Sequence, residues 1–115
     1  MSKLRIKYNT ESLKKLLPEL ECSQVEIYFD TENEEQLQEI ATVFHKAGER
    51  KVKRALAVIL KNDYHDQVYK KKKGDLAVIK LAIGEQKQEI HHIYCSEVFE
   101  NGRKTVSIRY CLRKK

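Results

Sequence analysis

Three consecutive strand-like runs near the C-terminal end constrain the fold of this chain more than any other feature. Residues 76–83 are almost continuously apolar and rich in β-branched side chains, with Lys80 as the one charge, which is typical of a central strand. Turn residues at 84–87 and 100–103 separate this run from further strand-like runs at 88–99 and 104–113. The pattern predicts a three-stranded antiparallel meander.

The turn at Asn101-Gly102 decides which side chains of the last two runs share a face of the sheet. A two-residue turn puts Phe99 opposite Lys104, whereas a turn with Gly102 in a bulge puts Phe99 opposite Arg103. The two alternatives differ by one residue in register, so they place the side chains of one strand on opposite faces of the sheet.

Alternation in the last run favours one of the two turns. Polar residues at odd positions leave Val106, Ile108, Tyr110 and Leu112 as the expected buried set. The two-residue turn would bring Glu97 into the core, so we predict the bulged turn. It matches the buried set with Ile90, His92, Tyr94 and Val98. It also places four residues on the open face as a cationic strip containing an imidazole: Lys80, His91, Arg109 and Arg113.

The residue pattern in the first two thirds of the chain predicts further strands and helices that support this meander. Residues 3–8 alternate basic and apolar side chains, as an edge strand does, and a short helix follows that Pro18 should end or kink. Residues 25–30 predict a strand, and Thr31 with Glu34 predicts a capping box. Apolar spacing then predicts two helices between residues 34 and 62, separated at Gly48. We expect residues 67–75 to form an exposed loop.

Composition limits the class of protein. The chain has 115 residues, which fits one domain, and 23 Lys and Arg against 17 Asp and Glu give a net charge of +6. A basic balance favours a polyanionic partner, nucleic acid before membrane. No apolar run has the roughly 20 residues of a membrane span, and no signal-peptide core is present, so we expect a cytoplasmic protein. The three cysteines lack metal-ligand spacing and are expected to be reduced, with no metal or other cofactor.

Two groups of residues could carry chemistry. The tetrad Lys70–Lys73 predicts either a solvated loop or a phosphate-binding loop, because lysines neutralise backbone phosphates without reading sequence. His91 can transfer a proton near neutral pH, while Lys80 and Arg109 on the same face could stabilise charge developing on phosphorus. That combination would suffice for RNA cleavage.

The order of strand, helical hairpin, basic loop, meander and basic end resembles the RelE/ParE-like toxins of bacterial toxin–antitoxin pairs. The resemblance covers residues 23–115 and rests on the segments 71–81, 91–94, 99–106 and 112–115. It leaves residues 1–22 as an N-terminal strand–helix extension. The implied fold is an α+β antiparallel sheet packed against a helical hairpin.

The resemblance also implies an activity, which is ribosome-dependent cleavage of mRNA by attack of the ribose 2′-hydroxyl on the adjacent phosphate. By position, Lys80 matches the family's strand lysine, His91 its meander arginine and Arg113 its C-terminal basic residue. The implied partners are RNA, the ribosome and a cognate antitoxin, with Lys70–Lys73, Arg103 and Lys114 as RNA contacts. Two alternatives stay open. The chain could be a binding protein of the same fold without activity, including a ParE-like gyrase inhibitor, or a small basic phage-type regulatory protein.

Overall fold

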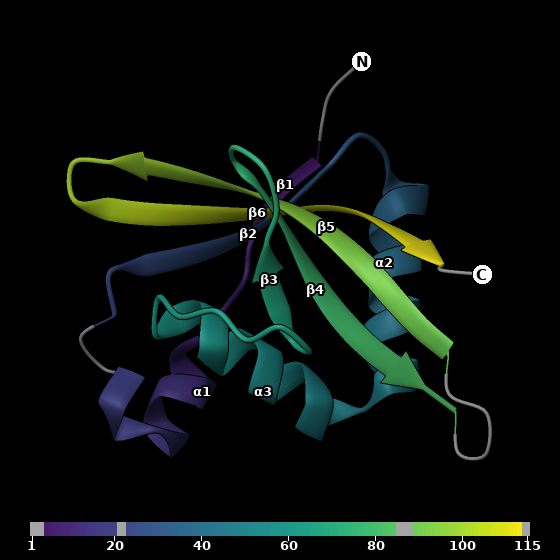
Figure 1. Cartoon of the computed structure of the whole chain (residues 1–115), viewed down its shortest axis with the longest axis horizontal. Coiled ribbons are helices and arrows are strands. Elements are labelled where there is room, and N and C mark those ends of the chain that lie inside the picture. Colours follow the sequence, from purple (N-terminus) through teal and green to yellow (C-terminus); the bar gives the residue numbers. More distant parts are fainter. Residues whose placement is uncertain (1–3, 21–22, 85–88, 114–115) are drawn as a thin grey trace.

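The computed structural model describes residues 4–20, 23–84 and 89–113. Its elements follow one another as a short N-terminal unit and then a longer run (Figure 1). The first unit comprises β1 (Leu4–Lys7), α1 (Glu11–Leu16) and a 3-10 turn at Pro18–Leu20. The rest comprises β2 (Val25–Thr31), α2 (Glu34–Ala47), α3 (Glu49–Leu60), β3 (Tyr69–Lys71), β4 (Leu76–Ile83), β5 (Glu89–Glu100) and β6 (Arg103–Arg113).

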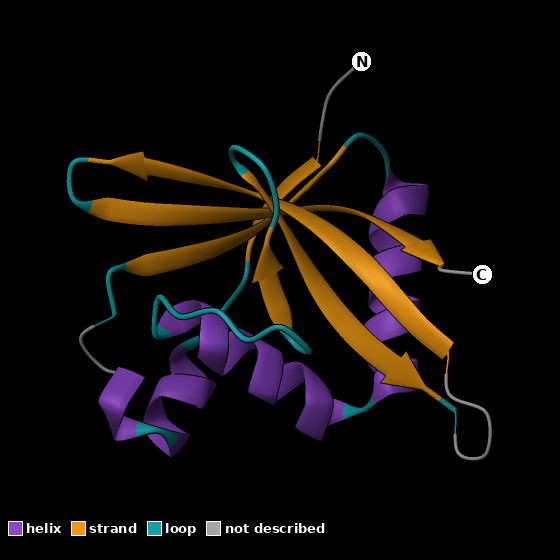
Figure 2. Ribbon diagram, viewed as in Figure 1, coloured by secondary structure: helices purple, strands orange, loops and turns teal. Residues whose placement is uncertain are grey.

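All the described strands join one mixed sheet, in the order β1-β2-β6-β5-β4-β3 (Figure 2). Strands β3 to β6 form an antiparallel meander, β1 pairs antiparallel with β2, and β2 runs parallel to β6. The predicted α+β fold with a C-terminal meander is therefore confirmed. One detail differs: part of the expected loop at 67–75 is β3, which adds a fourth strand to the meander.

The two main helices cover one face of this sheet. Helix α2 packs against β6 and β4, and α3 packs against β4, β2 and β3. The core between them contains alternate residues of four strands, which therefore lie on one inner face: Val25, Ile27, Ala77, Ile79, Leu81, Ile93, Cys95, Val106 and Ile108. Leu56, Ile59 and Leu60 of α3 are buried against it, as predicted, and Phe44 of α2 is partly buried.

Local chemistry explains where the helices begin and end. Gly48 separates α2 from α3 with a φ of 94°, a conformation that favours glycine, so the predicted break is confirmed. The predicted capping box is wrong. Asn33 caps α2 by accepting a hydrogen bond from the Gln36 backbone N–H at 2.9 Å. Thr31 instead ends β2 with a buried side chain. Helix α1 stops at Leu16, before Pro18, as expected.

The predicted bulged turn between β5 and β6 is also wrong. Phe99 pairs with Lys104 and Glu100 with Arg103, so Asn101 and Gly102 form a two-residue turn. Their φ angles of 52° and 76° fit a type I′ turn, which suits the twist of a hairpin. As the two-residue alternative requires, Glu97 lies on the inner face and is only 2% exposed, while Val98 is exposed.

A bulge lies elsewhere in the same hairpin. Tyr94 pairs with Tyr110 but Cys95 pairs with Ile108, which leaves Arg109 as an extra residue in β6. The bulge reverses the alternation beyond Ile108. Val106 and Ile108 are buried as predicted, whereas Tyr110 and Leu112 are on the open face and exposed.

Candidate nucleic-acid interface

The register places only part of the predicted catalytic strip on the open face. Lys80 pairs with His92 across β4 and β5, and Arg109 donates to the Ser96 hydroxyl of the same face at 3.4 Å. His91 pairs with Leu81, which belongs to the core, so its side chain lies on the inner side of the sheet. The predicted placement of His91 beside Lys80 is therefore wrong by one residue, because the turn at Asn101-Gly102 has no bulge.

The basic end of the chain is described only in part. Arg113 is the backbone partner of His91, which is on the inner side of the sheet, and its side chain lies outside the described residues. Lys114 also lies outside them. Their predicted roles in catalysis and RNA binding stay predictions.

Aromatic side chains gather on the open face where the charged strip was expected. The rings of Tyr94 and Tyr110 stack across β5 and β6 with centroids 5.1 Å apart. The His92 ring meets Tyr94 edge-on at 6.4 Å. Tyr110 is 38% exposed, and Leu112 and Ile90, which face the same side of the sheet, are also exposed. This face thus presents ring surfaces to solvent, which sequence analysis missed because it assigned these residues to the core.

On this open face, cations flank the rings towards both edges of the sheet. Lys80 lies in β4, where its amine donates to the Asp66 backbone carbonyl at 2.9 Å. Lys70 of β3 faces the same side, because it pairs with Val78, which pairs with Tyr94. Towards the opposite edge of the sheet, where β1 and β2 lie, the Arg5 guanidinium is 4.5 Å from the centre of the Tyr28 ring. Rings and positive charges are therefore interleaved across this face.

The lysine tetrad is divided between the two faces and a turn. Lys70 and Lys71 belong to β3, whereas Lys72 and Lys73 are exposed in the turn that leads to β4. Lys71 points to the inner side, where its amine lies 3.8 Å from a carboxylate oxygen of Glu97. The expected exposed loop is thus corrected to a strand end and a tight turn. Arg103 is exposed at the β5–β6 turn.

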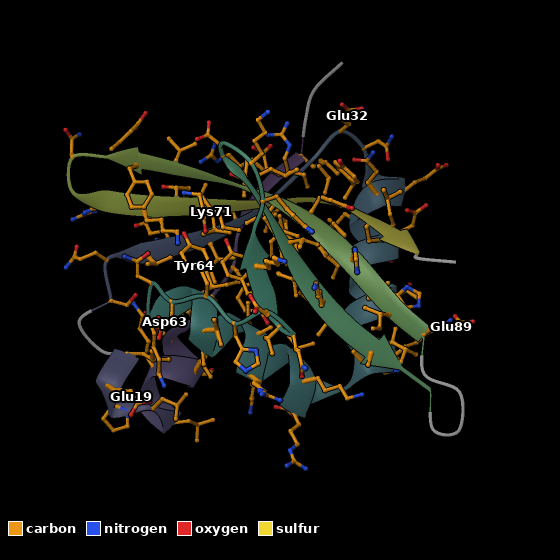
Figure 3. The ribbon with its side chains drawn as sticks, viewed as in Figure 1. Glu19, Glu32, Asp63, Tyr64, Lys71 and Glu89 are labelled. Atoms are coloured by element: carbon orange, nitrogen blue, oxygen red, sulfur yellow. The ribbon has the colours of Figure 1, made fainter. Side chains whose placement is uncertain are left out.

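A buried ionic cluster forms around Glu97 on the inner face, and sequence analysis did not predict it. The Lys104 amine binds Glu97 Oε2 at 2.8 Å, with both side chains almost fully buried. The Tyr69 hydroxyl donates to the same oxygen, and the Tyr64 hydroxyl donates to Oε1 at 2.8 Å. Lys104 also donates to the Asn62 side-chain carbonyl at 3.0 Å. Figure 3 labels Tyr64 and Lys71, both of which contact Glu97.

The surroundings of the cluster fix its protonation. Burial acts to raise the pKa of Glu97, but hydrogen bonds from Lys104, Tyr69 and Tyr64 outweigh burial and lower it. Burial and the carboxylate together raise the pKa of Tyr64 to about 12, and they raise the pKa of Tyr69 further. The cluster therefore holds an ionised Glu97 with neutral tyrosines, which suits a structural ion pair better than a general base.

The alternation of inward and outward residues along β5 and β6 indicates this cluster once the turn is correctly assigned. Glu97 occupies an inward position as soon as the turn at Asn101-Gly102 is given two residues, and that turn also brings Lys104 opposite Phe99. A carboxylate in the core disfavours this register when it is considered alone. A lysine on the same face compensates that carboxylate, so the two residues together favour the two-residue turn.

The described residues offer no evident metal site. Among residues 4–20, 23–84 and 89–113, no three His, Cys, Asp or Glu side chains are grouped to hold an ion. Cys95 and Cys111 are free thiols, and burial raises the pKa of Cys95, which disfavours its reactive thiolate form. None of the helices in this described part has the length and apolar character to cross a membrane.

Comparison with known proteins finds no relative. No protein-family model matches the chain. No curated protein and no solved structure matches it either. Interpretation of the open face therefore depends on its own geometry and chemistry.

Proposed function

We propose that this protein binds single-stranded RNA on the open face of its sheet and cleaves it as a RelE-like endoribonuclease. The observation that carries the proposal is the stack of half-buried Tyr94 on exposed Tyr110, with His92 opposite Lys80 on the same face. Aromatic rings bind unpaired bases by stacking, and neighbouring cations follow the phosphate backbone. The net charge of +6 agrees with a polyanionic partner.

The same face offers groups for the proposed reaction, with His92 in the role that the sequence assigned to His91. The His92 imidazole takes the proton of a ribose 2′-hydroxyl, and the 2′-oxygen attacks the adjacent phosphorus. The bond to the 5′-oxygen breaks, that oxygen takes a proton from water, and a 2′,3′-cyclic phosphate is left. Lys80 and Arg109 stabilise the negative charge on phosphorus during the transfer.

Two further features support an RNA substrate of this kind. The order β2, α2, α3 and meander is the order that the RelE resemblance implies. A sheet face that α2 and α3 leave uncovered suits extended single strands, whose bases are unstacked, better than duplex RNA, whose bases are hidden. On this proposal the natural substrate is mRNA on the ribosome, and an antitoxin would cover the face when cleavage is not required.

The adjacent histidines supply a matched test. We expect His92→Ala to lower the rate of mRNA cleavage about 10²–10⁴-fold, the usual loss of a proton-transfer group, whereas His91→Ala retains the rate per folded molecule. The assay uses ribosome-bound mRNA and free single-stranded RNA, with product ends examined for a 2′,3′-cyclic phosphate. Both variants are checked for folding by circular dichroism.

The outcome separates enzyme from binding protein. Equal activity of His92→Ala and the unmodified protein would contradict the proposed chemistry. If the unmodified protein binds RNA through Tyr94 and Tyr110 but cleaves none, the cleavage proposal is withdrawn. The non-enzymatic alternative then holds for the same face. It has its own support in Lys80, whose amine already donates to the Asp66 carbonyl.

A further inference from the structure

A polar pocket lies on the other side of the β5–β6 hairpin from the aromatic stack. Its volume is about 390 Å³, and its lining comes from the segment around Ser23–Val25, the C-terminal end of α3 with Lys61 and Asn62, and the end of the hairpin. Phe99 stands at this pocket with 60% of its surface exposed. It is more exposed than any other phenylalanine or tyrosine among the described residues.

The buried cluster determines what the pocket can offer a ligand. Lys104 has three N–H donors, and they are directed to Glu97, to Tyr64 at 3.4 Å and to the Asn62 side-chain oxygen at 3.0 Å. An ammonium group can only donate, so this contact fixes the orientation of the Asn62 amide. Its NH₂ group is then what Asn62 can present to the pocket. The pocket thus combines an aromatic wall with an oriented amide donor.

We propose that this pocket holds one unstacked nucleobase of a bound RNA strand, stacked on Phe99 and hydrogen-bonded through an acceptor atom to the Asn62 amide. A planar ring with a carbonyl or ring-nitrogen acceptor matches both features. Gln24, which also lines the pocket, brings a second amide to the same space. This proposal rests on the proposed binding of RNA to the open face.

The end of β5 lies between the two sites. Strand β4 pairs with β5 only as far as Ser96, so the residues after Glu97 extend beyond the first residue of β4. Val98 points to the open face and is exposed, and Phe99 points to the pocket side. An RNA strand that leaves the Tyr94–Tyr110 stack can pass over this short edge and place a base several nucleotides further along on Phe99, five residues from Tyr94 in β5.

The test compares conservative replacements of one ring. Phe99→Leu keeps an apolar side chain but removes the stacking surface, and Phe99→Tyr keeps the ring. We expect Phe99→Leu to weaken binding of a single-stranded 12-nucleotide RNA roughly five- to hundredfold, the loss usual for one stacked base. The dependence of affinity on salt should not change, because no charge is removed. Phe99→Tyr should bind as the unmodified protein does.

Tyr110→Leu on the open face distinguishes failure of the pocket from failure of the proposed function. If Tyr110→Leu weakens RNA binding and Phe99→Leu does not, the base pocket is overturned and binding to the open face stands. If neither variant changes the affinity, both proposals are overturned. A direct readout uses uridine monophosphate at millimolar concentration, which should shift the side-chain amide resonances of Asn62 and Gln24. Unchanged resonances together with an unaffected Phe99→Leu variant would also overturn the pocket.

Discussion

The Glu97–Lys104 pair is the interaction on which the hairpin register depends at the level of single residues. Taking two charges out of water costs several kcal/mol per ion, and good geometry with further hydrogen bonds offsets that cost. Here the two tyrosine hydroxyls and Asn62 provide those bonds. The described residues contain no buried side-chain nitrogen or oxygen without a hydrogen-bond partner. This register buries both charges, and it is stable because the two charges compensate each other.

Removing one partner should leave an uncompensated buried charge. We expect Lys104→Met to lower the free energy of unfolding by about 3–5 kcal/mol, whereas Lys61→Met, which breaks the exposed pair with Glu19, should cost under about 1 kcal/mol. Urea denaturation measures both. The double variant Glu97→Leu with Lys104→Met should recover much of the loss. A Lys104→Met loss as small as that of Lys61→Met would show that the pair contributes little.

The same cluster predicts the pH dependence of stability. The raised pKa of Tyr64, about 12, means that its stabilising effect is complete below the unfolded value near 10 and is lost as the pH rises towards 12. The lowered pKa of Glu97 affects stability at acidic pH. Its contribution is present above about pH 4.3 and disappears as the pH falls through the folded value.

Tyr64→Phe isolates the alkaline part of this behaviour. The variant lacks the titrating hydroxyl, so its free energy of unfolding should fall less steeply between about pH 10 and pH 12 than that of the unmodified protein. Urea denaturation at a series of pH values provides the comparison. Parallel curves for the two proteins in that interval would contradict a coupling between Tyr64 and Glu97.

At the scale of elements, the β5–β6 hairpin determines which residues face solvent. Its two-residue turn puts Glu97 and Lys104 inside, and the bulge at Arg109 then turns Tyr110 and Leu112 outwards. Both features are local, and each moves a whole strand segment to the other face. Sequence alternation alone gave one uninterrupted buried set in β6, so it assigned Val106 and Ile108 correctly and Tyr110 and Leu112 incorrectly.

Gly102 is the residue on which the turn can be tested. An added Cβ would meet nothing within 4 Å, so Gly102→Ala introduces no steric overlap and its effect comes from the positive φ alone. We expect a loss of about 1–2 kcal/mol in the free energy of unfolding, the cost of a left-handed conformation for a residue with a side chain. Glu100→Ala, in the same hairpin, is the control and should be nearly neutral. A neutral Gly102→Ala would argue against the type I′ turn.

At the scale of the molecule, the sequence predicted the positions of helices and strands more reliably than which strand side chains face solvent. The helical breaks at Pro18 and Gly48, the strands at β2 and β4 and the helical core around Leu56 follow from local propensity and apolar spacing. The open face could not be derived in the same way. It depends on how a buried charge at Glu97 is compensated by side chains from three segments, the connection after α3, β3 and β6, and on a bulge that no local pattern marks.

The division of the tetrad gives a sharper test of its role in binding. Lys71 interacts with Glu97, so replacing it would also disturb the fold, whereas Lys70, Lys72 and Lys73 can be replaced together by glutamine. We expect the slope of log affinity against log salt to fall by up to about 2 for single-stranded RNA, because each phosphate contact contributes roughly 0.7.

The control replaces three exposed helical cations instead: Lys15, Lys46 and Arg50. Both variants lose three charges, so a general effect of net charge would change both slopes equally. A change confined to the tetrad variant would locate phosphate contacts at the β3–β4 turn, and equal slopes in the two variants would make the tetrad a solvated turn without a role in binding.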